Sequence, residues 1–316
     1  MSFMLLVFMV LATLVSIVIA IDKPLTELNP LHPNFKQSSG DNAGLKVLVV
    51  VVDNRHLHNT LDSSSGFGSL VAVLQESYCK HHGYDYVRIV NDKTDLQKIV
   101  LEKYPKVTEE IFQKDTLNSI GDPKHGFDVL HPGYLRARSS SWGKLPALWH
   151  VAEQVGHRYD YIWFMDSDAT PNPMQKDQSL SDAIAKWDSN PKETVKWGNP
   201  KPSNATFLFM SNFPYRDDLP CAGTIVFKPT QYARDAIREW WDFDLVYKAR
   251  DDFMEQDALW YLIEAEAAGY KYMVNSQSTA LLTETQFSSA WRGYSDIWFA
   301  HIPSAEEYRT GYFRTM

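Results

Sequence analysis

Cysteine is scarce in this chain, and clustered positive charge is missing from it. Cys79 and Cys221 are the only cysteines among 316 residues. Two cysteines cannot build a multi-disulfide framework, and their spacing fits no zinc site, so one bridge or two separate buried thiols are the options left. The net charge is -8 and no lysine or arginine run occurs, which argues against nucleic acid as a partner. With 44% hydrophobic residues, the chain can bury the core of one large or two small domains.

Charged residues are also missing from Phe3–Ile21, which is long enough to cross a lipid bilayer as a helix. A cleaved signal peptide is the alternative. However, no lysine or arginine precedes the apolar run, and Ala20-Ile21-Asp22 is a poor cleavage site. We therefore expect residues 1–21 to be an uncleaved transmembrane anchor, inserted in the bilayer through residues 3–21.

The rest of the chain divides into a short linker and a globular domain. Residues 22–44 are polar and rich in turn-forming residues, which is typical of a stem. Residues 45–316 carry the apolar runs of a folded domain. Asn204-Ala205-Thr206 within it is a glycosylation sequon, relevant if the domain is luminal.

The domain opens with a strand–helix–strand pattern. Lys46–Asp53 is an unbroken β-branched run of the kind found in central parallel strands. Apolar residues then recur at helical spacing over Leu70–Tyr78, and Gly83 is placed to end that helix. Tyr84–Val90 has the composition of the next strand. This order predicts a βαβ unit.

A second helix and strand follow. Ser141 is placed to cap a helix that runs through Val155, and Gly156 is placed to end it. The apolar run Tyr161–Met165 then predicts a buried strand, which Pro171 and Pro173 prevent from continuing.

The second half of the domain has a less regular pattern. Residues 186–220 are predicted to be loop-rich, and Ala222–Phe227 to be a buried strand. Helices are predicted to start at Pro229 or Thr230 and to cover about 252–268, with short strands near 270–274 and 297–300. The expected fold class is α/β, with a Rossmann-like, mostly parallel sheet flanked by helices.

Two aspartates follow the strand that ends at Met165. Asp166 and Asp168 are expected at the carboxyl edge of the sheet, where open α/β folds bind ligands. Two carboxylates at such a place suit a hard divalent cation. A solvated turn is the alternative, because Asp-x-Asp is frequent in loops.

Five segments together resemble one family of enzymes. They are Tyr78–Tyr86, Ser141–Leu148 with its Trp-x-Lys, Tyr159–Ala169, Glu255–Leu259 and Phe299–His301, and they occur in order within the part of the chain, roughly residues 46 to 302, that the resemblance covers. These segments resemble the Golgi galactosyl- and xylosyltransferases, a family that includes fungal α-1,2-galactosyltransferases and plant xyloglucan xylosyltransferases. The resemblance implies a GT-A fold that carries an Asp-x-Asp motif.

The same resemblance implies the activity and its setting. The enzyme would move galactose or xylose from a nucleotide-sugar donor, UDP-linked by expectation, to an oligosaccharide or glycoprotein acceptor, with retention of anomeric configuration. It would be a single-pass type II protein of the Golgi or endoplasmic reticulum membrane, with a luminal catalytic domain.

Asp166, Asp168 and His301 are the metal ligands that the resemblance implies. A divalent cation bridging the two donor phosphates would offset the charge that develops when the sugar–phosphate bond breaks. Oxygen and imidazole ligands together favour Mn²⁺ over Mg²⁺. A partly buried structural histidine is the alternative for His301.

Other residues are candidates for binding the donor. Asp53 and Asn54, at the end of the first strand, are placed to meet the nucleoside, although Asp53 would also serve as a cap. Lys144 would approach the phosphates or be a solvated residue of a first helical turn. Asp166 and Ser167 complete this predicted donor site.

Asp257 and Gln256 are the candidate catalytic residues. At the start of a helix, Asp257 could orient an acceptor hydroxyl or stabilise an oxocarbenium-like sugar. Its alternative role is a favourable contact with the helix dipole.

Two other functions remain open. A haloacid-dehalogenase-type phosphatase would use Asp166 as its nucleophile and Asp168 as its acid/base, because Asp-x-Asp-x-Thr after an apolar strand also fits that class. A membrane-anchored carbohydrate-binding protein would bind without turnover.

Overall fold

The fold is given by a computed structural model. It describes residues 44–53, 64–90, 129–131, 136–138, 140–172, 175–198, 201–212, 216–243, 255–283 and 299–301. The predicted anchor at 1–21, nearly all of the stem, and Asn54 lie outside the described residues. Among the helices of the described part of the chain, none is both long and apolar enough to cross a membrane.

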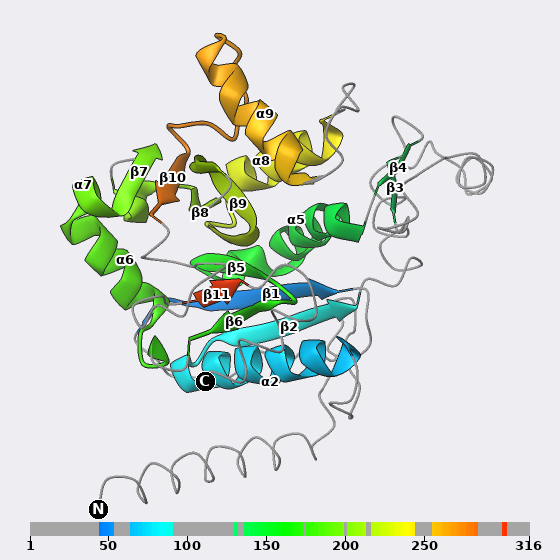
Figure 1. Ribbon diagram of the computed structural model, residues 1–316, viewed down its shortest axis with the longest axis vertical. Helices are drawn as coiled ribbons and strands as arrows, with labels where there is room; N and C mark the ends of the chain where they lie inside the picture. The colour runs from blue at the N-terminus through cyan, green and yellow to red at the C-terminus, as the bar shows by residue number, and fades with distance from the viewer. Residues whose placement is uncertain are drawn as a thin grey trace, which may run out of the picture.

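A seven-stranded sheet forms the centre of the molecule, in the order β2-β1-β5-β9-β8-β10-β7 (Figure 1). Its strands are β1 (Val47–Asp53), β2 (Asp85–Val90), β5 (Tyr161–Asp166), β7 (Val195–Gly198), β8 (Phe207–Asn212), β9 (Arg216–Phe227) and β10 (Thr279–Leu282). β1 pairs in parallel with β2 and β5, and β8 with β10, whereas β9 is antiparallel to β5 and β8, and β10 to β7. The sheet is therefore mixed, and the prediction of a mostly parallel sheet is wrong for its second half.

Helices cover both faces of this sheet. They are α2 (Ser64–His82), α5 (Lys144–Val155), α6 (Leu180–Ser189), α7 (Pro191–Thr194), α8 (Gln231–Asp242) and α9 (Glu255–Ala267). Leu48 and Val50 of β1 pack in one apolar cluster with α5, α8 and α9. Val47, Val49 and Val51 pack in the other cluster, with α2 and α6. β1 thus contributes to two cores, which explains why its sequence is apolar throughout instead of alternating.

The predicted βαβ unit is confirmed. β1, α2 and β2 follow one another, and β1 and β2 pair in parallel from Leu48–Asp85 to Asp53–Val90. Gly83 ends α2 with φ 70°, a left-handed conformation that costs glycine little.

Three other predictions need correction. Ser141 does not cap α5, because it lies in a 3₁₀ helix, Ser140–Gly143, and Gly143 precedes α5 with no side-chain cap. Residues 186–220 hold β7 and the fully buried β8 instead of being loop-rich. The strand expected at 270–274 is absent there, and β10 forms instead at Thr279–Leu282. By contrast, the predicted start of α8 is confirmed, since Thr230 Oγ1 accepts a hydrogen bond from Ala233 N.

Small elements complete the described chain. Two two-stranded sheets pair β6 (Ala169–Pro171) with β11 (Phe299–His301), and β3 (Val129–His131) with β4 (Arg136–Arg138). Further 3₁₀ helices cover Gly156–Arg158 and Pro202–Asn204.

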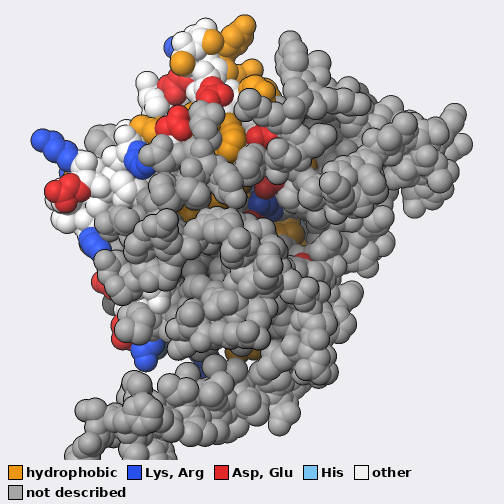
Figure 2. Space-filling model, in the orientation of Figure 1, with side chains coloured by type: hydrophobic (Ala, Val, Ile, Leu, Met, Phe, Trp, Pro, Cys, Tyr) orange, Lys and Arg blue, Asp and Glu red, His pale blue; other side chains and the backbone are white. Residues whose placement is uncertain are grey.

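Three large hydrophobic side chains are exposed on the described part of the chain, whereas both cysteines are buried. Large hydrophobic side chains exposed among the described residues are Tyr232, Tyr261 and Tyr270, and Figure 2 shows hydrophobic and acidic side chains together at the end of the molecule formed by α9. Cys79 and Cys221 are buried and not bridged, which confirms two separate thiols. Burial raises the pKa of the Cys79 thiol well above its ordinary value.

Candidate functional site

The two predicted metal-binding aspartates lie in a tight turn between β5 and β6. Asp166 is the last residue of β5, Ser167 and Asp168 form the turn, and Ala169 begins β6. These three turn residues are partly exposed, although the strands on either side are buried. The apolar strand therefore delivers two carboxylates to the surface at its carboxyl end.

This turn lies where the order of the sheet reverses. β1 has β2 on one side and β5 on the other, and Val52 of β1 is in register with Asp166 of β5. The carboxyl ends of β1 and β5, which carry Asp53 and Asp166, are therefore neighbours. In open α/β sheets, the crevice at such a reversal is where ligands bind.

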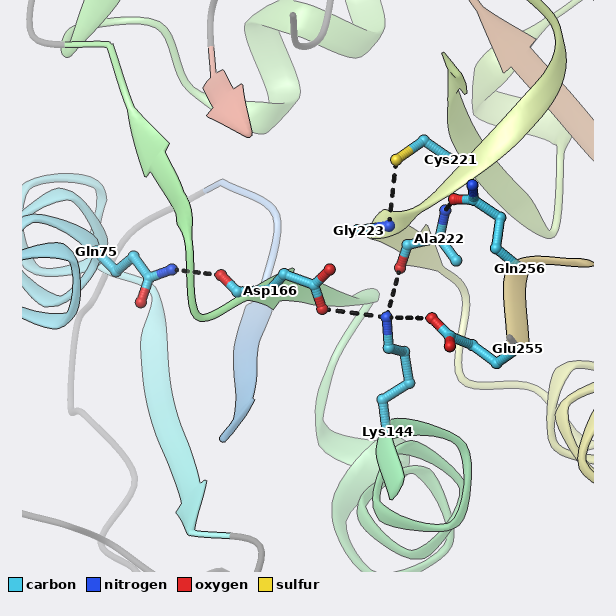
Figure 3. A network of polar contacts seen from close by, with 8 residues as sticks. All are labelled: Gln75, Lys144, Asp166, Cys221, Ala222, Gly223, Glu255 and Gln256. Carbon is cyan, nitrogen blue, oxygen red and sulfur yellow. Dashed lines mark hydrogen bonds and ion pairs between the residues drawn. The ribbon is translucent and has the colours of Figure 1, made fainter. Parts of the chain in front are cut away.

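Lys144 joins the turn to the helices on one face of the sheet. Its Nζ lies 3.1 Å from Asp166 Oδ1 and 2.8 Å from Glu255 Oε1, and it donates to the Ala222 carbonyl oxygen at 3.2 Å (Figure 3). An ammonium group has three hydrogens, so these three contacts match its donor capacity. The predicted contact of Lys144 with phosphates stays a prediction.

The carboxylates of Asp166 and Glu255 stabilise the positive charge of Lys144 at a position that would otherwise disfavour it. Lys144 is buried and is the first residue of α5, where the helix dipole opposes positive charge. Burial lowers the pKa of Lys144, but attraction to Asp166 and Glu255 outweighs it, so the pKa is raised above its ordinary value. Lys144 is therefore charged at neutral pH and fixes the carboxylate of Asp166.

Glu255 is a site residue that the sequence analysis missed. It is 5% exposed, it pairs with Lys144 through Oε1, and its Oε2 is buried without a hydrogen-bond partner within the described chain. Trp240 Nε1 donates to its backbone oxygen at 2.8 Å. A glutamate in a first helical turn is usually explained by the helix dipole. The available signal was the resemblance segment, which begins at this residue.

The two predicted catalytic residues lie in the first turn of α9, which packs against β9. Gln256 and Asp257 are both buried. Gln256 Oε1 accepts a hydrogen bond from Ala222 N at 2.7 Å, so Ala222 is held by Gln256 at its nitrogen and by Lys144 at its oxygen (Figure 3). The catalytic roles of Gln256 and Asp257 stay predictions, whereas their place beside the Lys144 cluster is a structural fact.

Asp53 has a structural contact at the end of β1. Its Oδ2 lies 2.7 Å from Arg88 Nη2 of β2, and the two side chains are only 3% and 2% exposed. The contact described for Asp53 is therefore an ion pair with Arg88, and not the cap that the sequence analysis gave as its alternative role. Its predicted role in nucleoside binding is not tested by this geometry.

His301 is brought to the turn by strand pairing. β11 is antiparallel to β6, with His301 opposite Ala169, the residue that follows Asp168 (Figure 1). Within the described side chains no group of three His, Cys, Asp or Glu residues has the spacing of a metal site. The three predicted ligands therefore share one region of the backbone, and metal binding by them stays a prediction.

Comparisons with known proteins found no relative by sequence and some solved structures of low similarity. No protein-family model matches the chain, and no curated protein matches its sequence. One similar solved structure is a glycosyltransferase involved in the glycosylation of the major capsid of PBCV-1, with TM-score 0.49 and 12% identity over 85% of this chain and 99% of that one. Another is the bifunctional glycosyltransferase WbbM in its apo structure, with TM-score 0.40 and 14% identity over 88% of this chain and 47% of that one. Neither match assigns the chain to a family.

Proposed function

We propose that the chain is a metal-dependent glycosyltransferase of the GT-A type. It moves galactose or xylose from a UDP-linked donor to a glycan or glycoprotein acceptor, with retention of configuration. The observation that carries this proposal is the pairing of His301 with Ala169, directly beside Asp168 at the reversal point of the sheet. The sugar, the acceptor and the retention of configuration come from the family resemblance.

The residues of the turn fit a divalent cation in part. Asp166 and Asp168 offer hard oxygen donors, and the side chain of Asp166 is 25% exposed, so it is reachable from solvent while it contacts Lys144. His301 would be the third ligand, which favours Mn²⁺. When bound, the cation supplies positive charge that stabilises the diphosphate leaving group.

The remaining site residues position the reacting groups. Lys144 keeps the Asp166 carboxylate oriented, and Ser167 and Asp53 lie at the edge where the donor would bind. Asp257, with Gln256 beside it, is proposed to face the sugar or the acceptor hydroxyl from the start of α9. Glu255 joins this group because it shares the Lys144 cation with Asp166.

The proposal includes a cellular setting. Residues 3–21 would anchor the protein in the Golgi or endoplasmic reticulum membrane, with the catalytic domain in the lumen. The apolar sequence of this segment and the family resemblance support that setting.

The test is transfer by the full chain in detergent, with Mn²⁺ and a panel of nucleotide sugars and oligosaccharide acceptors. Transfer, or donor hydrolysis without acceptor, is the expected result. Phosphate release from simple phosphate esters without any nucleotide sugar would favour the phosphatase. Sugar binding without turnover would favour the carbohydrate-binding protein.

Asp168→Ala tests the metal assignment within this experiment. We expect a loss of transfer of at least about 100-fold, because one ligand of the cation is removed. Asp235→Ala is the matched control, since Asp235 is an exposed aspartate of α8 that accepts a hydrogen bond from Gln231. Full activity of Asp168→Ala would show that the metal assignment is wrong.

A further inference from the structure

Gln75 bridges the two ends of the Asp-Ser-Asp turn from the opposite face of the sheet. This α2 residue is fully buried. Its Nε2 donates to the backbone oxygen of Asp166 at 3.1 Å and to that of Ala169 at 2.6 Å (Figure 3 shows the first contact). A side-chain amide carries two N–H donors, so one amide group serves both carbonyl groups. These carbonyls flank Ser167 and Asp168.

The orientation of the Gln75 amide is fixed by its two carbonyl partners, because only its nitrogen can donate to them. Tyr86 donates its hydroxyl hydrogen to Gln75 Oε1 at 3.3 Å. A flipped amide would place Oε1 against two carbonyl oxygens and lose both of those bonds, whereas the Tyr86 hydroxyl could accept a hydrogen bond from Nε2 in place of donating one. The network therefore specifies a donor group at this position.

The turn is held at two different places. Lys144 of α5 contacts the carboxylate of Asp166, whereas Gln75 of α2 contacts the backbone of the same residue and of Ala169. If only the side chain of Asp166 were held, the peptide units of the turn could still rotate, and Asp168 would then move. Bonds to both flanking carbonyls restrict that rotation.

We infer that Gln75 is a positioning residue for the metal site, acting through the backbone of the turn that carries Asp166 and Asp168. This inference rests on the proposed function. Partners that orient metal ligands typically change metal affinity by 10- to 100-fold when they are removed. Gln75 is a buried polar residue of α2, the helix that packs against β6. Positioning the turn would explain why a polar side chain is buried there.

The test uses Gln75→Glu and Gln75→Met, neither of which keeps both donors. Both variants are compared with the wild type by calorimetric titration with Mn²⁺ alone and by the dependence of transfer on Mn²⁺ concentration. We expect Kd for Mn²⁺ and the Mn²⁺ concentration at half-maximal rate to rise at least about tenfold. We expect KM for the acceptor to stay unchanged.

Two controls separate positioning from general loss of stability. Ile237→Val removes a buried methylene group in α8, a helix that carries none of the predicted site residues, and should lower stability without changing Mn²⁺ affinity. Tyr86→Phe keeps both carbonyl contacts of Gln75 and removes only the hydroxyl, so its Kd should rise less than that of Gln75→Met.

The outcomes of the titrations are distinguishable. Wild-type Mn²⁺ affinity in Gln75→Met or Gln75→Glu, with Mn²⁺ bound by the wild type, would overturn the role of Gln75 and leave the proposed function intact. No Mn²⁺ binding by the wild type would overturn the proposed function and this inference with it. If both Gln75 variants fail to fold, Gln75→Asn decides, because its shorter amide cannot reach both carbonyl oxygens, and an unchanged Kd in that variant would overturn the inference.

Discussion

Two buried ion pairs at the carboxyl edge of the sheet differ in charge balance and in access to solvent. Arg88 and Asp53 form a one-to-one contact whose side chains are 2% and 3% exposed. Lys144 instead contacts two carboxylates, and one of them, Asp166, is 25% exposed. The first pair sums to zero charge, whereas the three charged groups of the second sum to -1.

This difference leads to a prediction: the partly exposed cluster around Lys144 should affect activity more than the buried Arg88–Asp53 pair does. A buried ion pair with zero net charge attracts a further ion only weakly, and its main effect is on the free energy of unfolding. A partly open cluster with excess negative charge attracts a cation and keeps its carboxylate oriented before the cation arrives. Substitutions in the two pairs should therefore affect stability and activity in different proportions.

Arg88→Met should have the largest effect on stability. It leaves the Asp53 carboxylate buried without its guanidinium partner, which typically costs about 3–5 kcal/mol of unfolding free energy. Urea denaturation of the variant measures the loss. Adding Asp53→Asn should recover part of it, because the isolated charge is then removed. A stability equal to that of the wild type would show that the pair does not hold β1 to β2.

Lys144→Met should cost somewhat less stability, about 3 kcal/mol, because solvent reaches one of the two carboxylates left behind. Its effect on transfer should be larger than that of Arg88→Met, since the Asp166 carboxylate loses its orientation. Denaturation and initial rates with saturating Mn²⁺ measure the two effects. If both variants lowered activity only in proportion to their folded fraction, the comparison between the pairs would be wrong.

Glu255→Gln should change the free energy of unfolding by no more than about 1 kcal/mol. Lys144 keeps its ion pair with Asp166, and the side chains at positions 144, 166 and 255 then sum to zero charge. Transfer should still fall, since the excess negative charge is gone. Comparing unfolding free energy with Mn²⁺ affinity in the same variant tests this. A large loss of stability with unchanged Mn²⁺ affinity would make Glu255 a structural residue.

His82 should have the smallest effect, far from both ion pairs. Its Nε2 lies 2.8 Å from the Lys176 carbonyl oxygen, and burial lowers the pKa of His82 below its ordinary value. Because the folded-state pKa is below the unfolded value, stability should fall as the pH drops through about 6.5. His82→Gln should reduce the difference in melting temperature between pH 7.5 and pH 5.5. An unchanged difference would assign that pH dependence to other groups.

The parallel half of the fold could be predicted because each of its elements has a local signal. β1 and β5 are continuous apolar runs, and Gly83 marks the end of α2. β8 was missed because Phe207–Asn212 is short and lies in a segment rich in proline and asparagine. It is a strand because β9 and β10 pair with its two edges, which no local pattern reports.

The site could be predicted only where its residues lie close together in the sequence or belong to the segments that resemble the transferase family. Asp166 and Asp168 follow a strand, so their place was evident. The contact of Glu255 with Lys144 joins residues more than 100 positions apart. Gln75 did leave a signal, because it is a polar residue between Val71 and Tyr78 on the apolar face of α2.

Every strand of the seven-stranded sheet precedes β11 along the chain, so it also leaves the ribosome before β11 does. A nascent chain that has emerged through Leu282 can therefore pair every strand of the large sheet while β6 still lacks its partner. Under this arrangement, the large sheet and the proposed metal site would form in separate steps. The proposed activity would then depend on β11, a three-residue strand and the last strand among the described residues.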